Sequence, residues 1–176
     1  MTRTPSEPQA NASPPHRAES SVVVGVDGSP GSSEALHWAI TEARFRNVPL
    51  RAVHAWTYAG PLIPSLVGYP YSAESFDSTV DDRRQAAEEM LGRATSELAE
   101  TRGIEIERVI AEGSAARVLI EAVEANDLLV VGSRGHGGFT SLLLGSVSQQ
   151  CAQHAPCPVV IVRGTKAPNA REEGPK

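Results

Sequence analysis

The stretch Leu128-Leu129-Val130-Val131-Gly132-Ser133-Arg134-Gly135-His136-Gly137-Gly138-Phe139 passes from an unbroken apolar run into a loop with four glycines in seven positions. An apolar run without polar alternation is typical of a parallel strand that is covered on both faces. Glycine has no Cβ, so the loop can bring backbone N–H groups close to a ligand. Farther on, Gly145-Ser146 resembles the start of a helix, where free N–H groups and the helix dipole favour an anion. The stretch therefore predicts a buried strand followed by a phosphate cradle.

The spacing of these glycines carries a family resemblance. Two residues separate Gly132 from Gly135, nine separate Gly135 from Gly145, and a serine follows. This pattern resembles the nucleotide-binding signature of the universal stress proteins. The resemblance covers about residues 21–163, because two further segments look like that family's first and last strands: Val22-Val23-Val24-Gly25-Val26-Asp27-Gly28-Ser29 and Cys157-Pro158-Val159-Val160-Ile161-Val162. It implies an ATP-binding domain over residues 21–163.

The composition excludes several classes of protein. The 176 residues suit one domain with a substantial core. A net charge of -5 argues against non-specific nucleic-acid binding, and no apolar run approaches the roughly 20 residues that span a bilayer. Residues 1–20 are polar, contain four prolines and lack the apolar segment of a signal peptide. We expect a disordered tail there, a second one over residues 164–176, and a cytoplasmic protein.

Cysteine and lysine are informative because they are rare. Cys151 and Cys157 are too few for a disulfide framework or a four-ligand metal site, and we expect small buried side chains. Both lysines, Lys166 and Lys176, lie in the C-terminal tail, and no Gly-Lys-Ser/Thr sequence occurs. A Walker-type P-loop is therefore excluded. A bound phosphate would be met by backbone N–H groups, hydroxyls, Arg134 and a metal ion.

Hydrophobic periodicity predicts alternating strands and helices. Ser29 and Pro30 are a typical helix start, Asn47 and Gly103 are typical helix ends, and Ser114 is a candidate N-cap. Strands are expected at 22–26, 50–56, 104–110, 128–132 and 158–162, and helices at 30–46, 80–102, from 114 onward, and at 146–154. This alternation predicts an α/β fold: an open, five-stranded parallel sheet with helices on both faces.

The family resemblance adds the strand order 3-2-1-4-5, in a fold similar to the Rossmann-like adenine nucleotide alpha hydrolases. In that order the first and fourth strands are neighbours whose crossovers leave in opposite directions. Open α/β sheets bind ligands at such a switch point, beyond the carboxyl ends of the strands. The loops that follow Val26 and Val131 would meet there.

Residues 57–79 are expected to lack regular structure, because they contain three prolines and two glycines. They also hold four of the chain's eight aromatic residues. This segment could be a surface loop with its aromatic rings packed on the core. It could also be a flap over a ligand site or an oligomer contact.

Three candidate site residues lie on the first two strands. Asp27 could hold a ribose hydroxyl, or bind Mg²⁺ that in turn binds phosphate oxygens, or merely form a turn with Gly28. Gly25 could allow close approach of a ligand or tight strand packing. The resemblance implies that Val53 contacts adenine through its backbone, although a valine in a strand is usually part of the core.

The other candidates belong to the glycine-rich loop and the helix start. Gly132 and Gly135 could admit ribose and phosphate or simply turn the chain, and Arg134 could pair with a phosphate or be solvated. His136 could be an ordinary exposed loop histidine, and Ser146 an ordinary N-cap. The nucleotide-binding set that the resemblance implies here is Gly132, Ser133, Arg134, Gly135, His136, Gly145, Ser146, Val147 and Ser148.

Three functions follow from these observations. The first is a stress-associated regulator that binds ATP with Mg²⁺ and has little or no turnover. The second is a slow ATPase or nucleotidyl transferase, for which no clear general base or arginine clamp is visible besides Asp27 and Arg134. The third is an interaction protein of the same fold that binds no nucleotide. The resemblance also implies a homodimer formed through residues 158–162, because an uncovered apolar edge strand invites pairing.

Overall fold

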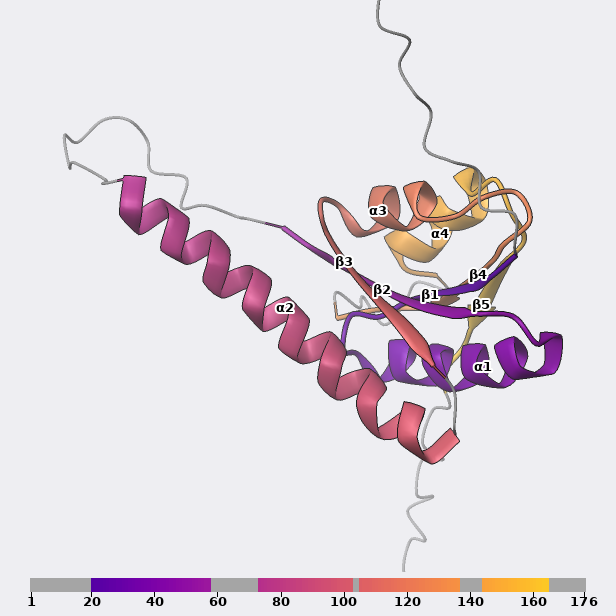
Figure 1. Cartoon of the computed structure of the whole chain (residues 1–176). Helices are drawn as coiled ribbons and strands as arrows, with labels where there is room; N and C mark the ends of the chain where they lie inside the picture. Colours follow the sequence, from indigo (N-terminus) through magenta and orange to yellow (C-terminus); the bar gives the residue numbers. More distant parts are fainter. Residues whose placement is uncertain (1–19, 58–72, 103–104, 137–143, 165–176) are drawn as a thin grey trace, which may run out of the picture.

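The computed structural model describes residues 20–57, 73–102, 105–136 and 144–164, with the backbone alone at 73–79, 97 and 99–102. Its elements, in chain order, are β1 (Val22–Gly25), α1 (Pro30–Arg46), β2 (Leu50–Trp56), α2 (Ala73–Arg102), β3 (Ile106–Glu112), α3 (Ala115–Glu121), β4 (Leu128–Gly132), α4 (Ser146–His154) and β5 (Val159–Val162). The five strands form one parallel sheet in the order β3-β2-β1-β4-β5. Helices α1 and α2 lie on one face, and α3 and α4 lie on the other (Figure 1). The predicted fold class and strand order are confirmed.

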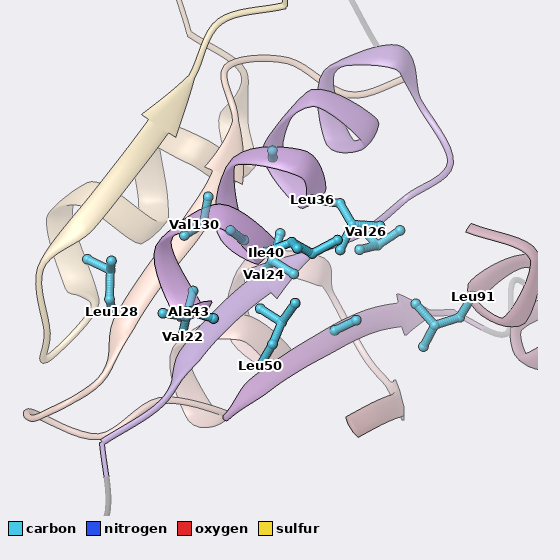
Figure 2. Close-up of a cluster of buried hydrophobic side chains, with 13 residues drawn as sticks. Val22, Val24, Val26, Leu36, Ile40, Ala43, Leu50, Leu91, Leu128 and Val130 are labelled. Carbon is cyan, nitrogen blue, oxygen red and sulfur yellow. The ribbon is translucent and has the colours of Figure 1, made fainter. Parts of the chain in front are cut away.

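The two central strands are buried because both of their faces are covered by helices. Val22, Val23 and Val24 of β1 are all 0% exposed. Since side chains alternate along a strand, Val22 and Val24 pack against α1, whereas Val23 packs in the cluster under α3 and α4. Figure 2 shows the first cluster, in which Leu91 of α2 joins side chains of α1 and the sheet. An apolar sequence without alternation is thus required at these positions.

The predicted boundary of α2 is wrong. The helix begins at Ala73, seven residues before the expected start at Val80. Residues 81–86 are all exposed, and the buried stripe of α2 begins only at Ala87. Periodicity could therefore not reveal the first turns, which extend beyond the sheet in Figure 1. The expectation of irregular structure fails over 73–79, and the rest of the aromatic segment, 58–72, lies outside the described residues.

Other boundaries move by one or two residues. β3 begins at Ile106 rather than 104 because it pairs along the whole of β2, from Leu50↔Ile106 to Trp56↔Glu112. β1 ends at Gly25, one residue early, and β5 begins at Val159, one residue late. The expected helix end at 103 and both expected tails, apart from Ser20 and Gly164, fall outside the described residues.

The predicted helix caps have mixed outcomes. Ser29 caps α1, because its hydroxyl accepts a hydrogen bond from the Ser32 N–H at 3.2 Å. Asn47 ends that helix in the left-handed region, with φ 54°. Ser114 occupies the N-cap of α3 but makes no side-chain capping bond. The N-cap of α4 is Gly145, so the interpretation of Ser146 as a cap is wrong.

Of the two rare cysteines, Cys151 is buried as expected, whereas Cys157 is only partly buried. Cys151 is 0% exposed within the cluster under α3 and α4, and Cys157 packs against the same cluster. Burial raises the pKa of the Cys151 thiol to about 11. In the part of the chain that the structure describes, no helix combines the length and the apolar composition needed to cross a membrane.

Asp127 ties the amino-terminal ends of the two central strands together. Its Oδ1 accepts hydrogen bonds from the backbone N–H and the hydroxyl of Ser21, both at 2.7 Å. Its Oδ2 accepts one from the Glu124 N–H at 2.9 Å. Because Asp127 is only 6% exposed, water cannot easily replace these three bonds. This carboxylate therefore fixes β1 beside β4 at the end opposite to the switch point.

We expect Asp127→Ala to lower the free energy of unfolding by about 2–3 kcal/mol, because it leaves buried donors unsatisfied. Urea denaturation at neutral pH measures the loss. Asp82→Ala, at an exposed position of α2, is the matched control and should change stability by less than about 0.5 kcal/mol. Equal effects of the two substitutions would contradict a role for the Asp127 hydrogen bonds.

Candidate functional site

A cavity of about 470 Å³ opens at the carboxyl ends of β1, β2 and β4. This is the switch point, because β1 and β4 are neighbours in the sheet while their crossovers lead to different faces. Of the twelve predicted site residues, eleven line the cavity: Gly25, Asp27, Val53, Gly132, Arg134, Gly135, His136, Gly145, Ser146, Val147 and Ser148. The fold thus brings together residues that are more than 100 positions apart in the sequence.

The turn after β1 presents a carboxylate at the cavity. The Asp27 Oδ1 accepts a hydrogen bond from the Ser29 N–H at 2.9 Å, and Gly28 takes the positive φ of 82° that the turn requires. Burial acts to raise the pKa of Asp27, but hydrogen bonds from Ser29, with the charge of His136, outweigh it and hold the pKa below its ordinary value. Asp27 is therefore ionised at neutral pH.

The loop after β4 lies directly against this turn because glycines remove the side chains between them. A Cβ on Gly132 would come within 2.8 Å of the backbone of Gly31, at the start of α1. One on Gly31 would come as close as 2.5 Å to the carbonyl oxygen of Arg134. One on Gly135 would collide with the Asp27 carboxylate. Close packing, against backbone at Gly132 and Gly31 and against the Asp27 side chain at Gly135, is thus the reason for glycine at these positions.

The entrance of α4 is an uncapped helix start. Its N-cap, Gly145, has the extended backbone of a cap, with φ -76° and ψ 162°, but offers no side chain to the N–H groups of the first turn. Ser146, Val147 and Ser148 follow and line the cavity. An anion placed there would meet these N–H groups and the positive end of the helix dipole.

Ser133 is the predicted site residue that does not line the cavity. It is 8% exposed, and its backbone holds the loop: its carbonyl accepts hydrogen bonds from the Gly145 N–H at 2.8 Å and the Ser148 hydroxyl at 3.2 Å. Its own N–H donates to the Val162 carbonyl at 2.7 Å. The Ser148 hydroxyl also approaches the Gly145 carbonyl at 2.9 Å. Both serines therefore act here as scaffold, since the single Ser148 proton is shared between two carbonyls.

The end of β2 contributes more than the sequence predicted. The Val53 side chain is 1% exposed, and its carbonyl accepts the Val26 N–H at 2.9 Å, as strand pairing requires. Residues two apart in a parallel strand point their backbone groups at the same neighbour. The backbone groups of Ala55 therefore point toward the side of β2 on which β1 lies. β1 has already ended at this level of the sheet, and Ala55 lines the cavity.

The missed lining residues lie mostly at strand ends or on helices that the motif does not include. They are Val26, Ser32, His54, Ala55, Ala115, Leu119, Val131 and Leu144. A systematic search of the last residues of each expected strand would have found Ala55 and His54. Leu119 of α3 could be placed only by tertiary packing: a Cβ on Gly25 would come within 2.9 Å of its Cδ1. Gly25 thus serves strand–helix packing as well as the cavity.

The charges around the cavity are few. Among the lining residues that the structure describes, the acidic and basic side chains are those of Asp27, Arg134, His54 and His136. Within the described ranges no three His, Cys, Asp or Glu side chains form a metal-binding group. The arrangement suits a ligand with a flat apolar part, which would lie against Leu119 and Val131, and an anionic part at the start of α4.

We expect Gly132→Ala to lower the free energy of unfolding by about 1–3 kcal/mol, because the added methyl group forces the loop away from α1. Gly92→Ala makes the same chemical change in α2, where nothing lies within 4 Å of the new methyl group. It should raise stability by roughly 0.5–1 kcal/mol. Chemical denaturation of both variants is the test, and equal signs would refute the close-packing argument.

Comparison with known proteins agrees with this geometry. The model of the universal stress protein family matches residues 20–163. A universal stress protein of Bacillus subtilis is 33% identical over 145 residues, which cover 81% of this chain and 97% of that protein. One from Mycobacterium tuberculosis is 37% identical over 161 residues, 90% of this chain but 47% of that protein. The chain spans about half the length of the mycobacterial relatives that it matches.

Solved structures resemble this fold as well. A universal stress protein from Lactobacillus plantarum gives a TM-score of 0.65 at 19% identity, covering 84% of this chain and 100% of that one. A universal stress protein in complex with cAMP gives 0.58 at 28% identity, covering 85% and 100%. With its strand order, its switch-point cavity and a family match over nearly the whole described chain, this protein belongs to the universal stress protein family.

Proposed function

We propose that this protein is a cytoplasmic, stress-associated regulator that binds ATP with Mg²⁺ in the cavity between β1 and β4, with little or no turnover. The proposal treats residues 21–163 as one nucleotide-binding domain. The observation that carries it is the uncapped start of α4 at Gly145, beside a glycine-rich loop that borders the same cavity. A relative 28% identical to this chain was solved in complex with cAMP, which favours an adenine nucleotide.

Each part of the nucleotide has a matching part of the cavity. The base would lie against the apolar wall, where the backbone of Ala55 offers a donor and an acceptor beside Val53. Gly25, Gly132 and Gly135 would leave room for the ribose and the first phosphate. The remaining phosphates would meet the N–H groups of Ser146, Val147 and Ser148 and the guanidinium of Arg134. His136 would lie beside them at the edge of the loop.

The donor set fits a metal ion that the nucleotide itself largely holds. Mg²⁺ usually keeps several waters and is bound by one or two carboxylates together with substrate phosphates. Asp27 is the single lining carboxylate among the described residues, and it is ionised at neutral pH. We therefore assign Mg²⁺ to Asp27, where it would neutralise phosphate charge that Arg134 alone does not balance.

The first experiment is a thermal melt of protein stripped of bound nucleotide, with Mg-ATP and with ATP plus chelator. At a thousand times the dissociation constant, Mg-ATP should add about 4 kcal/mol, or roughly 10 °C in melting temperature. Gly145→Ser is the matched variant. Its hydroxyl would cap α4 in the free protein, raising stability by about a few tenths of a kcal/mol, but would occupy N–H groups that a phosphate needs. The shift with Mg-ATP should therefore shrink.

The outcomes separate the three functions. No shift in empty, folded protein would refute nucleotide binding and favour an interaction protein. A full shift in Gly145→Ser would place the phosphates elsewhere. Steady phosphate release that Asp27→Ala abolishes would make the protein an ATPase.

We also propose a homodimer formed through residues 158–162. In the described part of the chain, β5 pairs with β4 along one edge, and its four β-branched side chains are all half-buried. Such an edge can pair with a second copy. Sedimentation at micromolar concentration should give twice the chain mass of 18.6 kDa; the mass of a monomer would contradict the proposal.

A further inference from the structure

Two histidines, one from β2 and one from the loop after β4, donate hydrogen bonds to consecutive carbonyls of the β1 exit turn. The Nδ1 of His54, on β2, lies 2.7 Å from the Val26 carbonyl oxygen. The Nε2 of His136, in the loop after β4, lies 2.9 Å from the Asp27 carbonyl oxygen. A carbonyl oxygen only accepts, so each of these ring nitrogens must carry a proton. Neutral His54 is therefore the Nδ1–H tautomer, and neutral His136 is the Nε2–H tautomer.

These two bonds act where strand pairing stops. β1 ends at Gly25, and the last ladder bond of this strand to β2 is the one from the Val26 N–H to Val53. The next residue, Asp27, carries the carboxylate that faces the cavity, and Gly28 then turns the chain with a positive φ. From Val26 onward, hydrogen bonds from the imidazoles of His54 and His136 hold the backbone carbonyls that a neighbouring strand would otherwise bind.

We propose that His54 and His136 are positioning residues that clamp the β1 exit turn from both sides and so aim the Asp27 carboxylate at the metal-bound phosphates of the nucleotide. This inference rests on the proposed function. Neither histidine needs to touch the ligand for it to hold. The partner of a metal-binding carboxylate typically matters for affinity because it fixes the orientation of that ligand.

The surroundings of His136 explain how an exposed side chain can hold this turn. An isolated hydrogen bond in water contributes little, because it must first order both partners. Here the partners are already in place: Gly135, the preceding residue, lies against the Asp27 carboxylate, and Gly132 lies against the start of α1. The same loop carries Arg134. The hydrogen bond from His136 to the Asp27 carbonyl therefore also connects the loop that carries Arg134 to the turn that carries Asp27.

The test exploits the position of the amide nitrogen in asparagine and glutamine. The Asn amide can replace a donor at Nδ1, whereas the longer Gln amide can replace one at Nε2. His54→Asn and His136→Gln should therefore keep the clamp, and the exchanged pair, His54→Gln and His136→Asn, should lose it as the alanine variants do. His37→Ala, on the exposed face of α1, is the control that removes a histidine elsewhere.

Calorimetric titration with ATP, with and without Mg²⁺, gives the functional readout. The alanine variants should bind Mg-ATP roughly 10-fold more weakly, and they should lose less affinity for ATP when Mg²⁺ is absent. His54→Asn, His136→Gln and His37→Ala should stay within about 3-fold of the unsubstituted protein. Equal losses with and without Mg²⁺, or no rescue by the matched amides, would overturn the positioning role.

A ligand-free readout separates this inference from the proposed function. ¹⁵N spectra of the imidazoles should give the Nδ1–H tautomer at His54 and the Nε2–H tautomer at His136. The Ser29 amide, which donates to the Asp27 Oδ1, should exchange its hydrogen faster in the alanine variants. If the unsubstituted protein binds no nucleotide, the proposed function fails, and the role toward a ligand fails with it. Unchanged exchange or opposite tautomers would overturn the clamp whether or not ATP binds.

Discussion

The close approach of two segments, the turn after β1 with the start of α1 and the end of β4 with the loop that follows it, is the contact on which the site depends. Gly132 meets the backbone of Gly31, and Gly135 meets the Asp27 carboxylate. A side chain at any of these positions would push the two loops apart. The cavity would then lose either the carboxylate or the start of α4, since each belongs to a different loop. Glycine at these positions is thus the structural requirement on which the shape of the cavity depends.

The two loops can be held in this contact because the sheet is rigid at its other end. Asp127 joins the starts of β1 and β4 through buried hydrogen bonds, and the two strands between are 0–5% exposed along Val22–Val24 and Leu128–Val131. The carboxyl ends therefore emerge at a fixed separation. Loops that would otherwise lose much conformational entropy on ordering begin from anchored positions. Stability is concentrated at one end of the strands and ligand-binding geometry at the other.

Local patterns in the sequence were sufficient to predict most strands and helices, whereas the strand order, and with it the position of the cavity, was implied by the family resemblance. Continuous apolar runs mark strands covered on two faces, and the glycine spacing marks the loop beside the cavity. The errors have physical causes. The first turns of α2 bury no side chain that the structure describes, so periodicity carries no signal for the helix start at Ala73. Ser133 looks like a ligand residue by position, but it is its backbone N–H and carbonyl that act, and they hold the loop itself.

The end of β2 illustrates a limit of motif reasoning. A motif records side chains. Ala55 instead lines the cavity with a part of β2 that extends beyond the end of β1. The ring nitrogen of His54 makes a hydrogen bond to Val26 at the point where the pairing of β1 with β2 stops. Neither feature depends on a recognisable spacing. Both can be deduced once the sheet order places β2 beside β1 and the register shows that β1 ends at Gly25, opposite Val53.

The charge distribution argues for a binding protein whose ligand can leave. Apart from Arg134 and the two histidines, the described groups that could meet a phosphate are neutral N–H donors, and the sequence before Lys166 contains no lysine. Hydrogen bonds from neutral donors are roughly half as strong as charge-assisted ones. Under the function proposed above, such a site would respond to the concentration of the nucleotide and of the ion that accompanies it. Among the described lining residues, Arg134 is the one permanent positive charge that could meet charge developing on a phosphate.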